Sequence, residues 1–274
     1  MPELPDVEAT RRYLLDQGLA GRTFTGATIR WPKAIRSGPV EEFVLGLTGR
    51  RIDDVARRAK YLLVRLQPDD RAEQTLVIHL RMTGSLIVEP GASEPPRYAH
   101  NILHLDDGRD LRFVDPRKLG TLALVADEAS ALPALGPEPL EPAFTPQALG
   151  KALGRRVPVK ALLCDQAVVA GIGNIYADEA LFLACVHPAK PGNELTSAEV
   201  KRLHETIVSS LTEATVQIAR IMPAKGPPTE SDEGRSVLCV PRMAGAPCTR
   251  CGKPVQRVVI RSRSAYFCPR CQRG

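Results

Sequence analysis

The sequence contains no run of the roughly 20 apolar residues that a membrane-spanning helix needs. Its N-terminus also lacks the basic and then apolar stretch of a secretory signal. We therefore expect a cytoplasmic protein without a membrane partner. Internal repeats and low-complexity tracts are missing as well. With 274 residues and a hydrophobic content of 43%, the chain is long enough for a buried core and two domains, which argues against a disordered or fibrous protein.

Acidic residues are fewer than basic ones. The chain has 37 Lys and Arg against 31 Asp and Glu, which gives a formal net charge of +6 and a pI near 9.0. Such an excess suits a polyanionic partner such as nucleic acid. Taken alone, it fits an ordinary basic protein equally well.

The first half of the chain has the pattern of a β-rich domain behind one helix. Residues 6–21 predict an amphipathic helix, with acids early, two arginines later and Gly18 and Gly21 as stop signals. Short β-rich segments then continue to about residue 126, and Asp-Asp-Gly at 106–108 predicts a hairpin turn. This spacing predicts a sandwich or barrel whose strands fall at 22–31, 60–66, 75–80, 85–89, 101–105, 109–114 and 121–125.

The second half changes to helical patterns after a proline-rich linker at 133–142. Thr145 before Pro146 predicts one helix start, and the capping box from Thr196 to Glu199 predicts another. Residues 159–186 predict two buried helices that are broken at the Gly-Ile-Gly-Asn stretch 171–174. This break is either a tight turn, which is the better interpretation for a lone GxG, or a loop whose N–H groups hold a phosphate.

Seven cysteines divide into two kinds. Two CxxC pairs, Cys248 with Cys251 and Cys268 with Cys271, are sixteen residues apart. This spacing predicts four thiolates around one structural Zn²⁺, with a β-hairpin between the pairs. Because all four ligands come from protein, no coordination position is left for catalysis, and the metal's role is to fold the module. The remaining cysteines are predicted to be buried small apolar residues: Cys164, Cys185 and Cys239.

The cysteine-rich tail is strongly basic. Residues 248–274 hold seven Lys and Arg and no acid. Subtracting two for a zinc ion held by four thiolates leaves a charge of about +5, which predicts a phosphate-binding surface. A basic zinc ribbon that binds a protein partner is the alternative.

Six sequence blocks occur in order across almost the whole chain: MPELPDVE, AKYLLVRL, HLRMTGSL, DPRKLG, AGIGNIYADEALF and the terminal run of CxxC, RSRSAYFC and PRC. By these blocks the chain resembles the formamidopyrimidine-DNA glycosylase and endonuclease VIII superfamily. The resemblance implies an α+β fold: an N-terminal β-sandwich flanked by helices, a helical domain with a helix-two-turns-helix element, and a zinc-finger β-hairpin. The expected domains are a catalytic domain at 1–130, a linker at 131–145, a helical DNA-binding domain at 146–238 and a zinc finger at 239–274.

The resemblance also implies a base-excision-repair enzyme, expected to be monomeric. It would remove oxidised bases from double-stranded DNA and then cleave the abasic site. Removal of Met1 would expose the secondary amine of Pro2, and an α-amino group with a pKa of about 8 is already neutral in roughly a tenth of molecules at pH 7. Pro2 would form a Schiff base at C1′ of the sugar, Glu3 would transfer protons, and Lys60 would act beside them. The alternative is that Pro2 and Glu3 only start a helix.

The same resemblance assigns DNA contacts. Lys60, Asn174 and Arg263 match residues that grip phosphates, and Lys160 and His79 are further candidate contacts. Phosphate contacts position a duplex without reading its sequence. A stacked base must be flipped out at a cost of a few kcal/mol. The residues that would fill the resulting gap are Met82, Arg117 and Leu119, and the alternative for Met82 is a place in the core.

Three departures from the family pattern affect the choice of substrate. Asp6 stands where Glu is more frequent, and Leu119 replaces a phenylalanine. Residues 222–245, expected to include a mobile loop, carry Pro241 where the family has a tyrosine. The sequence therefore does not decide between two classes of substrate. One is 8-oxoguanine and formamidopyrimidines, and the other is oxidised pyrimidines, which an endonuclease VIII-like enzyme would prefer. A catalytically silent zinc-ribbon protein that binds damaged DNA is a further alternative.

Overall fold

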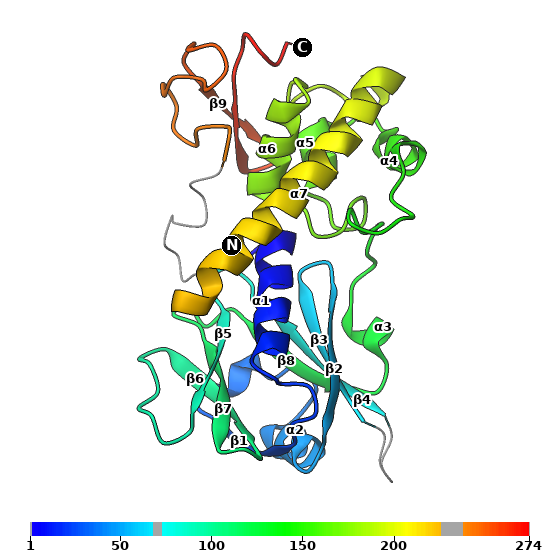
Figure 1. Ribbon diagram of the computed structural model, residues 1–274. Helices are drawn as coiled ribbons and strands as arrows, with labels where there is room; N and C mark the ends of the chain where they lie inside the picture. Colours follow the sequence, from blue (N-terminus) through cyan, green and yellow to red (C-terminus); the bar gives the residue numbers. More distant parts are fainter. Residues whose placement is uncertain (1, 68–72, 226–237, 274) are drawn as a thin grey trace. The chain divides into compact units, whose positions relative to one another are not determined.

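The computed structural model describes residues 2–67, 73–225 and 238–273. Their contacts divide the chain into two compact units (Figure 1). Unit 1 contains residues 2–133 and 215–225, and unit 2 contains residues 134–214 and 238–273. The predicted domain boundaries stay a prediction, and residues 226–237 of the loop expected within 222–245 lie outside the described residues. Among the described residues, no helix has the length and apolar character needed to cross a membrane.

Unit 1 is built on two four-stranded sheets, in which the described strands pair antiparallel. One sheet has the order β1-β6-β7-β5 and the other β2-β3-β4-β8. Leucine, isoleucine, valine and phenylalanine side chains from both sheets form one buried cluster. The predicted sandwich is therefore confirmed. Its strands are β1 (Phe24–Ile29), β2 (Ile52–Arg58), β3 (Tyr61–Leu66), β4 (Gln74–His79), β5 (Ser85–Pro90), β6 (Ala99–Leu105), β7 (Arg109–Val114) and β8 (Thr121–Val125).

Each predicted β-segment contains a strand, and the 106–108 turn joins β6 to β7. Four elements of unit 1 were not predicted: strand β2, helix α2 (Val40–Leu47), a 3₁₀ turn at Pro32–Ala34 and the short helix α3 (Glu128–Ala131). Strand β2 was missed because a bulge between Ile52 and Asp54 breaks the alternation of inward and outward side chains. Its two buried apolar residues, Ile52 and Val55, are three apart, which is not the period of a strand. Helix α2 interrupts the strand-like region, and it buries Phe43 and Leu47.

Helix α1 (Leu4–Asp16) packs against strands of both sheets, β2, β3 and β5. It begins two residues before the predicted start because Glu3 caps it. The left-handed Gly18, at φ 67°, follows its end as the sequence indicated. The described C-terminal part of α7 (Ser197–Lys225) also lies on α1, where Ile218 contacts Ala9 in a small buried cluster.

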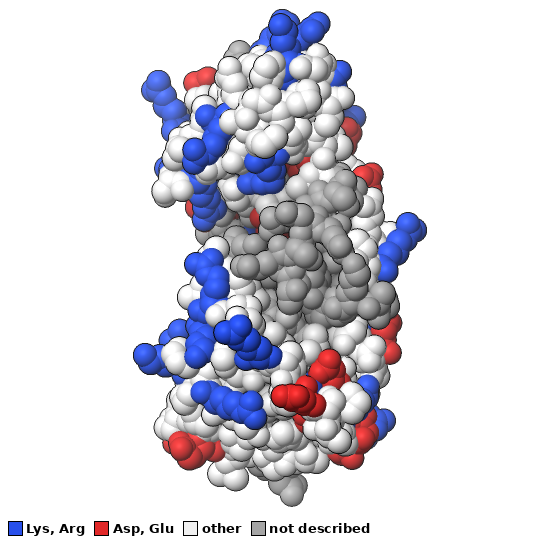
Figure 2. Space-filling view, turned by 90° about the vertical axis from the view of Figure 1, so that its left-hand side faces the viewer, with Lys and Arg blue, Asp and Glu red and all other residues white. Residues whose placement is uncertain are grey.

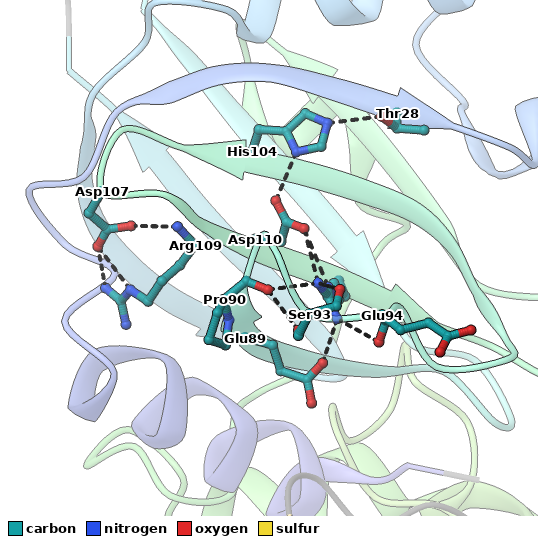
Figure 3. Close-up of polar contacts among 10 residues, drawn as sticks. Thr28, Glu89, Pro90, Ser93, Glu94, His104, Asp107, Arg109 and Asp110 are labelled. Carbon is teal, nitrogen blue, oxygen red and sulfur yellow. Dashed lines mark hydrogen bonds and ion pairs between the residues drawn. The ribbon is translucent and has the colours of Figure 1, made fainter.

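A polar network fixes the connection between β5 and β6 (Figure 3). The guanidinium of Arg112 is fully buried and donates to Glu89 Oε2 at 2.6 Å, Pro90 O at 2.9 Å and Ser93 O at 2.8 Å. It also approaches Asp110 Oδ2 at 3.3 Å. A buried charge is tolerated only when it is paired and hydrogen-bonded, and here one arginine holds a whole loop against the sheet.

Unit 2 is helical. Its described helices are α4 (Pro146–Leu153), α5 (Val159–Leu163), α6 (Asn174–Leu183) and the first part of α7, together with a 3₁₀ turn at Gly192–Glu194. Both predicted caps are confirmed. Thr145 Oγ1 accepts from Ala148 N at 3.1 Å. Thr196 and Glu199 form a reciprocal capping box with distances of 3.2 and 2.8 Å.

Both buried helices predicted within 159–186 are present, but the first is shorter than the predicted segment. Helix α5 ends at Leu163, and residues 164–173 form turns. The reason is that side chains replace the helical hydrogen bonds. Gln166 Oε1 accepts from Gly171 N at 2.9 Å, and Gln166 Nε2 donates to Ile172 O at 2.7 Å.

The C-terminal module contains the predicted hairpin, β9 (Gln256–Ile260) and β10 (Arg263–Phe267). Its two-residue turn has both central residues in the left-handed region, Arg261 at φ 45° and Ser262 at φ 62°, as a type I′ turn requires. The module is fastened to α6 by Arg250, which donates to the carbonyls of Phe182 and Leu183 at 3.1 Å. A cation at the C-terminal end of a helix satisfies its last carbonyls.

Candidate functional site

The N-terminal segment places Pro2 directly before the first turn of α1. Pro2 is partly exposed, whereas Glu3 is 1% exposed. The Glu3 side chain accepts from the Asp6 backbone, and Glu3 N donates to Asp6 Oδ2 at 2.7 Å. The shorter carboxylate at position 6 therefore completes a capping box. The buried Glu3 and its neighbour Pro2 are held at the positive end of the helix.

Glu8 is a buried meeting point for three arginines. Its carboxylate lies 2.8 Å from Arg11 Nη2, 3.1 Å from Arg12 Nε and 3.2 Å from Arg57 Nε. Burial opposes ionisation, but hydrogen bonds and positive charge from these arginines outweigh it and lower the pKa of Glu8 to about 2. Glu8 is therefore ionised at neutral pH, and it ties α1 to strand β2.

Arg57 continues this connection to Lys60. Arg57 Nη1 donates to Ala59 O at 3.0 Å. Ala59, at φ 52°, and Lys60 form the tight turn between β2 and β3. The Lys60 side chain is 7% exposed. One chain of contacts thus joins the helix that begins beside Pro2 to the turn that carries Lys60.

Replacing Glu8 with Gln should lower stability in a pH-dependent way. The folded-state pKa of about 2 lies below the ordinary 4.5, so the ionised carboxylate stabilises the fold above pH 4.5, and this contribution disappears as pH falls toward 2. After discounting for solvent screening, we expect Glu8→Gln to lose on the order of 1–2 kcal/mol at pH 7. Urea unfolding at pH 7 and pH 3 measures it. Glu41→Gln, at an exposed glutamate of α2, is the control and should leave the free energy of unfolding unchanged at both pH values. A Glu8→Gln deficit that is as large at pH 3 as at pH 7 contradicts the assignment.

His79 is held neutral. Burial, assisted by the charges of Arg81 and Lys60, lowers the pKa of His79 to about 3. Its Nδ1 accepts from Arg81 N at 2.9 Å, so the ring proton is on Nε2. His79 therefore offers a neutral hydrogen-bond donor.

The three residues predicted to fill the gap left by the flipped base, called the wedge residues below, lie on unit 1, where Met82 contacts Arg117 and Leu119 follows two residues after Arg117. Met82 and Leu119 are each 42% exposed, and Arg117 Nη1 lies 3.4 Å from Met82 Sδ. The alternative that placed Met82 in the core is wrong, because the side chain projects from a turn.

In unit 2, Asn174 and Arg263 occupy different elements. Asn174 is the first residue of α6, and its Oδ1 is buried without a hydrogen-bond partner among the described residues. Arg263 begins β10; it is exposed and donates from Nη1 to Cys164 O at 3.2 Å. It lines a cavity of about 400 Å³ together with the hairpin turn and the end of α5.

Lys160 is not at the surface. It is 1% exposed, and its Nζ lies 2.5 Å from Asp178 Oδ1 and 2.6 Å from Ser264 O. Asp178 Oδ2 also binds Arg242 at 3.0 Å. The predicted phosphate contact of Lys160 therefore has no exposed ammonium group to make it. The network instead joins α5, α6 and β10. Asp178, the partner of Lys160, was not singled out from the sequence, although an acid inside an apolar helix was a signal.

The four cysteines of the CxxC pairs form a metal site. Their Sγ atoms all lie within 4.8 Å of one another, including 3.5 Å between Cys251 and Cys268 and 4.0 Å between Cys248 and Cys271. Zn–S bonds of about 2.3 Å in a tetrahedron require sulfur separations of just under about 4 Å. The four thiolates thus supply the complete ligand set of one structural Zn²⁺.

The other cysteines only partly match the prediction. Cys164 is buried, and Cys239 is partly buried against the zinc module. Cys185 is exposed, so the prediction is wrong for it. It follows the end of α6 at φ 58°, and its Sγ lies 2.9 Å from Arg250 Nη1. This backbone conformation at the helix end turns the thiol outward.

Basic side chains are exposed on both units (Figure 2). In the hairpin module all seven cations of residues 248–273 are exposed: Arg250, Lys253, Arg257, Arg261, Arg263, Arg270 and Arg273. The predicted basic surface of this module is therefore solvent-facing and available to an anionic partner.

Comparisons with known proteins agree along the whole chain. Family models match the formamidopyrimidine-DNA glycosylase N-terminal domain at residues 1–122, its H2TH domain at 135–222, and a zinc finger found in FPG and IleRS at 245–274. A formamidopyrimidine-DNA glycosylase of Chloroflexus aurantiacus is 47% identical, over 99% of this chain and 98% of that protein. The sequence resemblance is thereby confirmed.

Two solved structures are similar throughout. One is Lactococcus lactis Fpg (MutM) in complex with DNA that contains N7-benzyl-Fapy-dG. It has a TM-score of 0.87 at 30% identity and covers 100% of both chains. The other is the MutM (Fpg) protein of Thermus thermophilus, with a TM-score of 0.83 at 37% identity over 99% of this chain and 98% of that one.

Proposed function

The chain belongs to the formamidopyrimidine-DNA glycosylase family, and from that premise we propose that it excises oxidised bases from double-stranded DNA and cleaves the abasic site through Pro2. The reaction class is that of a bifunctional DNA glycosylase and lyase. The observation that carries the proposal is the N-terminus, where a partly exposed proline precedes a buried, capping glutamate.

Pro2 is the nucleophile once Met1 has been removed. Its neutral nitrogen forms a bond to C1′ of the deoxyribose while the bond from C1′ to the base breaks. The attached nitrogen then loses its proton, and the C1′–O4′ bond of the sugar breaks to give an iminium. Because the amine is secondary, this iminium has no N–H proton to lose and keeps its positive charge. That cation accepts the electron pair released when a C2′ proton is removed, so the 3′ phosphate leaves, and the 5′ phosphate follows in a second elimination.

Glu3 and Lys60 assist this chemistry. Glu3 protonates the sugar oxygen as the ring opens and later returns protons, which the short tether to Pro2 allows. Lys60 contacts the phosphate next to the reacting sugar. The Glu8 and Arg57 contacts preserve the geometry of the turn that carries Lys60.

The remaining predicted contacts hold the strand. Asn174, Arg263 and His79 donate to phosphates on either side of the lesion, and the wedge residues fill the gap left by the flipped base. Lys160 acts indirectly: by pairing with Asp178 and binding Ser264 O, it fixes the strand that begins at Arg263.

The proposed substrates are formamidopyrimidines and 8-oxoguanine in duplex DNA. The Lactococcus lactis relative was solved with DNA that contains a formamidopyrimidine derivative, and the same class of lesion is proposed here. Oxidised pyrimidines are the alternative class. The enzyme is proposed to act as a monomer in the cytoplasm, on the nucleoid.

Borohydride trapping on duplexes with a single lesion tests the function. Borohydride reduces an iminium to a stable amine, so an active enzyme should become covalently attached to duplexes containing formamidopyrimidine, 8-oxoguanine or an abasic site. An undamaged duplex should give no adduct. Correctly processed protein that binds the abasic duplex without forming any adduct would favour the silent damage-binding protein, and an adduct only with oxidised pyrimidines would favour the endonuclease VIII-like alternative.

A further inference from the structure

The wedge residues lie on two loops that connect the same two sheets. Residues 80–84 lead from β4 in one sheet to β5 in the other, and residues 115–120 lead back from β7 to β8. Met82 lies on the first loop, and Arg117 and Leu119 lie on the second. These side chains are exposed, so their packing alone does not hold the two loops in register.

One buried carboxylate accepts hydrogen bonds from three backbone N–H groups of the second loop. Asp115 is 4% exposed. Its Oδ2 accepts from Leu119 N and Gly120 N, both at 2.7 Å, and its Oδ1 accepts from Arg117 N at 3.2 Å. A carboxylate has about four acceptor positions, and three are used to shape its own loop.

The fourth donor comes from the other loop. Thr83, which follows Met82, is 7% exposed, and its Oγ1 donates to Asp115 Oδ1 at 2.5 Å. Thr83 Oγ1 also lies 3.3 Å from Arg117 N, as an acceptor. Through this hydroxyl, the residue that follows Met82 is linked to the carboxylate that orients the loop of Arg117 and Leu119.

Apolar packing reinforces the bridge. The Phe113 ring contacts Gly84 on one loop and Gly120 on the other, and a Cβ at either glycine would collide with it. Each loop also contains a cation in the left-handed region, Arg81 at φ 56° and Lys118 at φ 55°. Such conformations persist only where the surroundings enforce them, so both loops are held in one constrained shape.

We propose that Asp115 and Thr83 are positioning residues that lock both loops into one preformed wedge, and that this lock allows the enzyme to act on a damaged base that is paired. The inference rests on the proposed function. An unpaired lesion needs no wedge, because there is no stacked partner to hold apart. The lock should therefore matter for duplex substrates and not for the chemistry at Pro2.

Thr83→Val tests the lock because it removes the hydroxyl and keeps the shape. In single-turnover assays with the full-length protein, excision of a formamidopyrimidine or 8-oxoguanine opposite cytosine should slow by about 10- to 100-fold. Excision of the same base from single-stranded DNA should be unchanged. Thr83→Ser, which restores the hydroxyl, should recover the duplex rate.

Thr75→Val is the matched control. Thr75 is 6% exposed and donates to Glu128 Oε1 at 3.0 Å, so it is another buried threonine bound to a carboxylate in the same sandwich. Its loss should leave the ratio of duplex to single-strand rates unchanged. Equal losses on both substrates in Thr83→Val, or a ratio no different from that of Thr75→Val, would overturn the proposal.

Amide hydrogen exchange supplies a readout that does not depend on catalysis. In the DNA-free protein, Thr83→Val should speed exchange at Leu119 and Gly120, whose amides donate to Asp115, whereas Thr75→Val should not. Unchanged protection of both amides would overturn the coupling. A wild-type protein that cuts neither substrate would instead overturn the proposed function, and this inference with it.

Discussion

Pro2→Gln protein is expected to fold normally and to lose its ability to form a trapped adduct. Glutamine is too large for removal of the initiator methionine, so the only α-amino group would move one residue away, about 3.8 Å along the chain. A misplacement of about 1 Å can cost about 10²-fold, so we expect strand cleavage to fall by at least about 10²-fold. Gel assays of cleavage on an abasic duplex measure it.

Pro2→Gly separates loss of the nucleophile from loss of its ring. Glycine permits methionine removal and leaves a primary amine at the same position, so an adduct should still form. The resulting imine can lose its proton and become neutral, which weakens the electron sink. Cleavage should therefore lie between wild type and Pro2→Gln. Wild-type cleavage by Pro2→Gln would contradict the role of the N-terminal nitrogen.

Cys268→Ala should unfold the C-terminal module. Cys268 is fully buried among the apolar residues of this module, and it is one of the four sulfurs of the metal site. Structural zinc contributes about 10–16 kcal/mol to the folding of zinc-finger peptides. Its loss should therefore release the Arg250 contacts to α6 and disperse the basic hairpin. We expect at least about tenfold weaker binding to an abasic-analogue duplex, about 1.4 kcal/mol, and a shallower salt dependence.

Cys185→Ala is the control for this experiment, because Cys185 is exposed and lies outside the metal site. It should retain one zinc per chain and full affinity. Metal analysis together with fluorescence anisotropy distinguishes the two variants. Cys268→Ala protein that still binds the duplex with wild-type affinity would show that the hairpin does not need its metal.

Local signals predicted much of the fold. The threonine caps at 145 and 196, the turn at 106–108 and the paired CxxC motifs depend on neighbouring residues, so they can be read without tertiary structure. The missed strand β2 and the short helix α5 have other causes. A bulge hides the alternation in the first, and Gln166 competes for the backbone in the second. Both causes depend on how side chains and strands meet, which sequence periodicity does not report.

The candidate site shows the same division. Motif matching singled out the proposed wedge residues and located the cysteines of the metal site, but it did not indicate the residues that contact them. Asp115 lies within a matched block, yet its link to Thr83, 32 residues away, exists only in the folded sandwich. Lys160 was predicted as a further phosphate contact, but in the structure its ammonium group is buried against Asp178, a partner that was not singled out from the sequence.

The most direct test of the account is peptide mapping of the borohydride-trapped complex by mass spectrometry. Trypsin should release the N-terminal peptide PELPDVEATR, residues 2–11, carrying the mass of the reduced sugar remnant and no initiator methionine. An adduct on a peptide containing Lys60, or on protein that still begins with methionine, would contradict the assignment of Pro2 as the nucleophile.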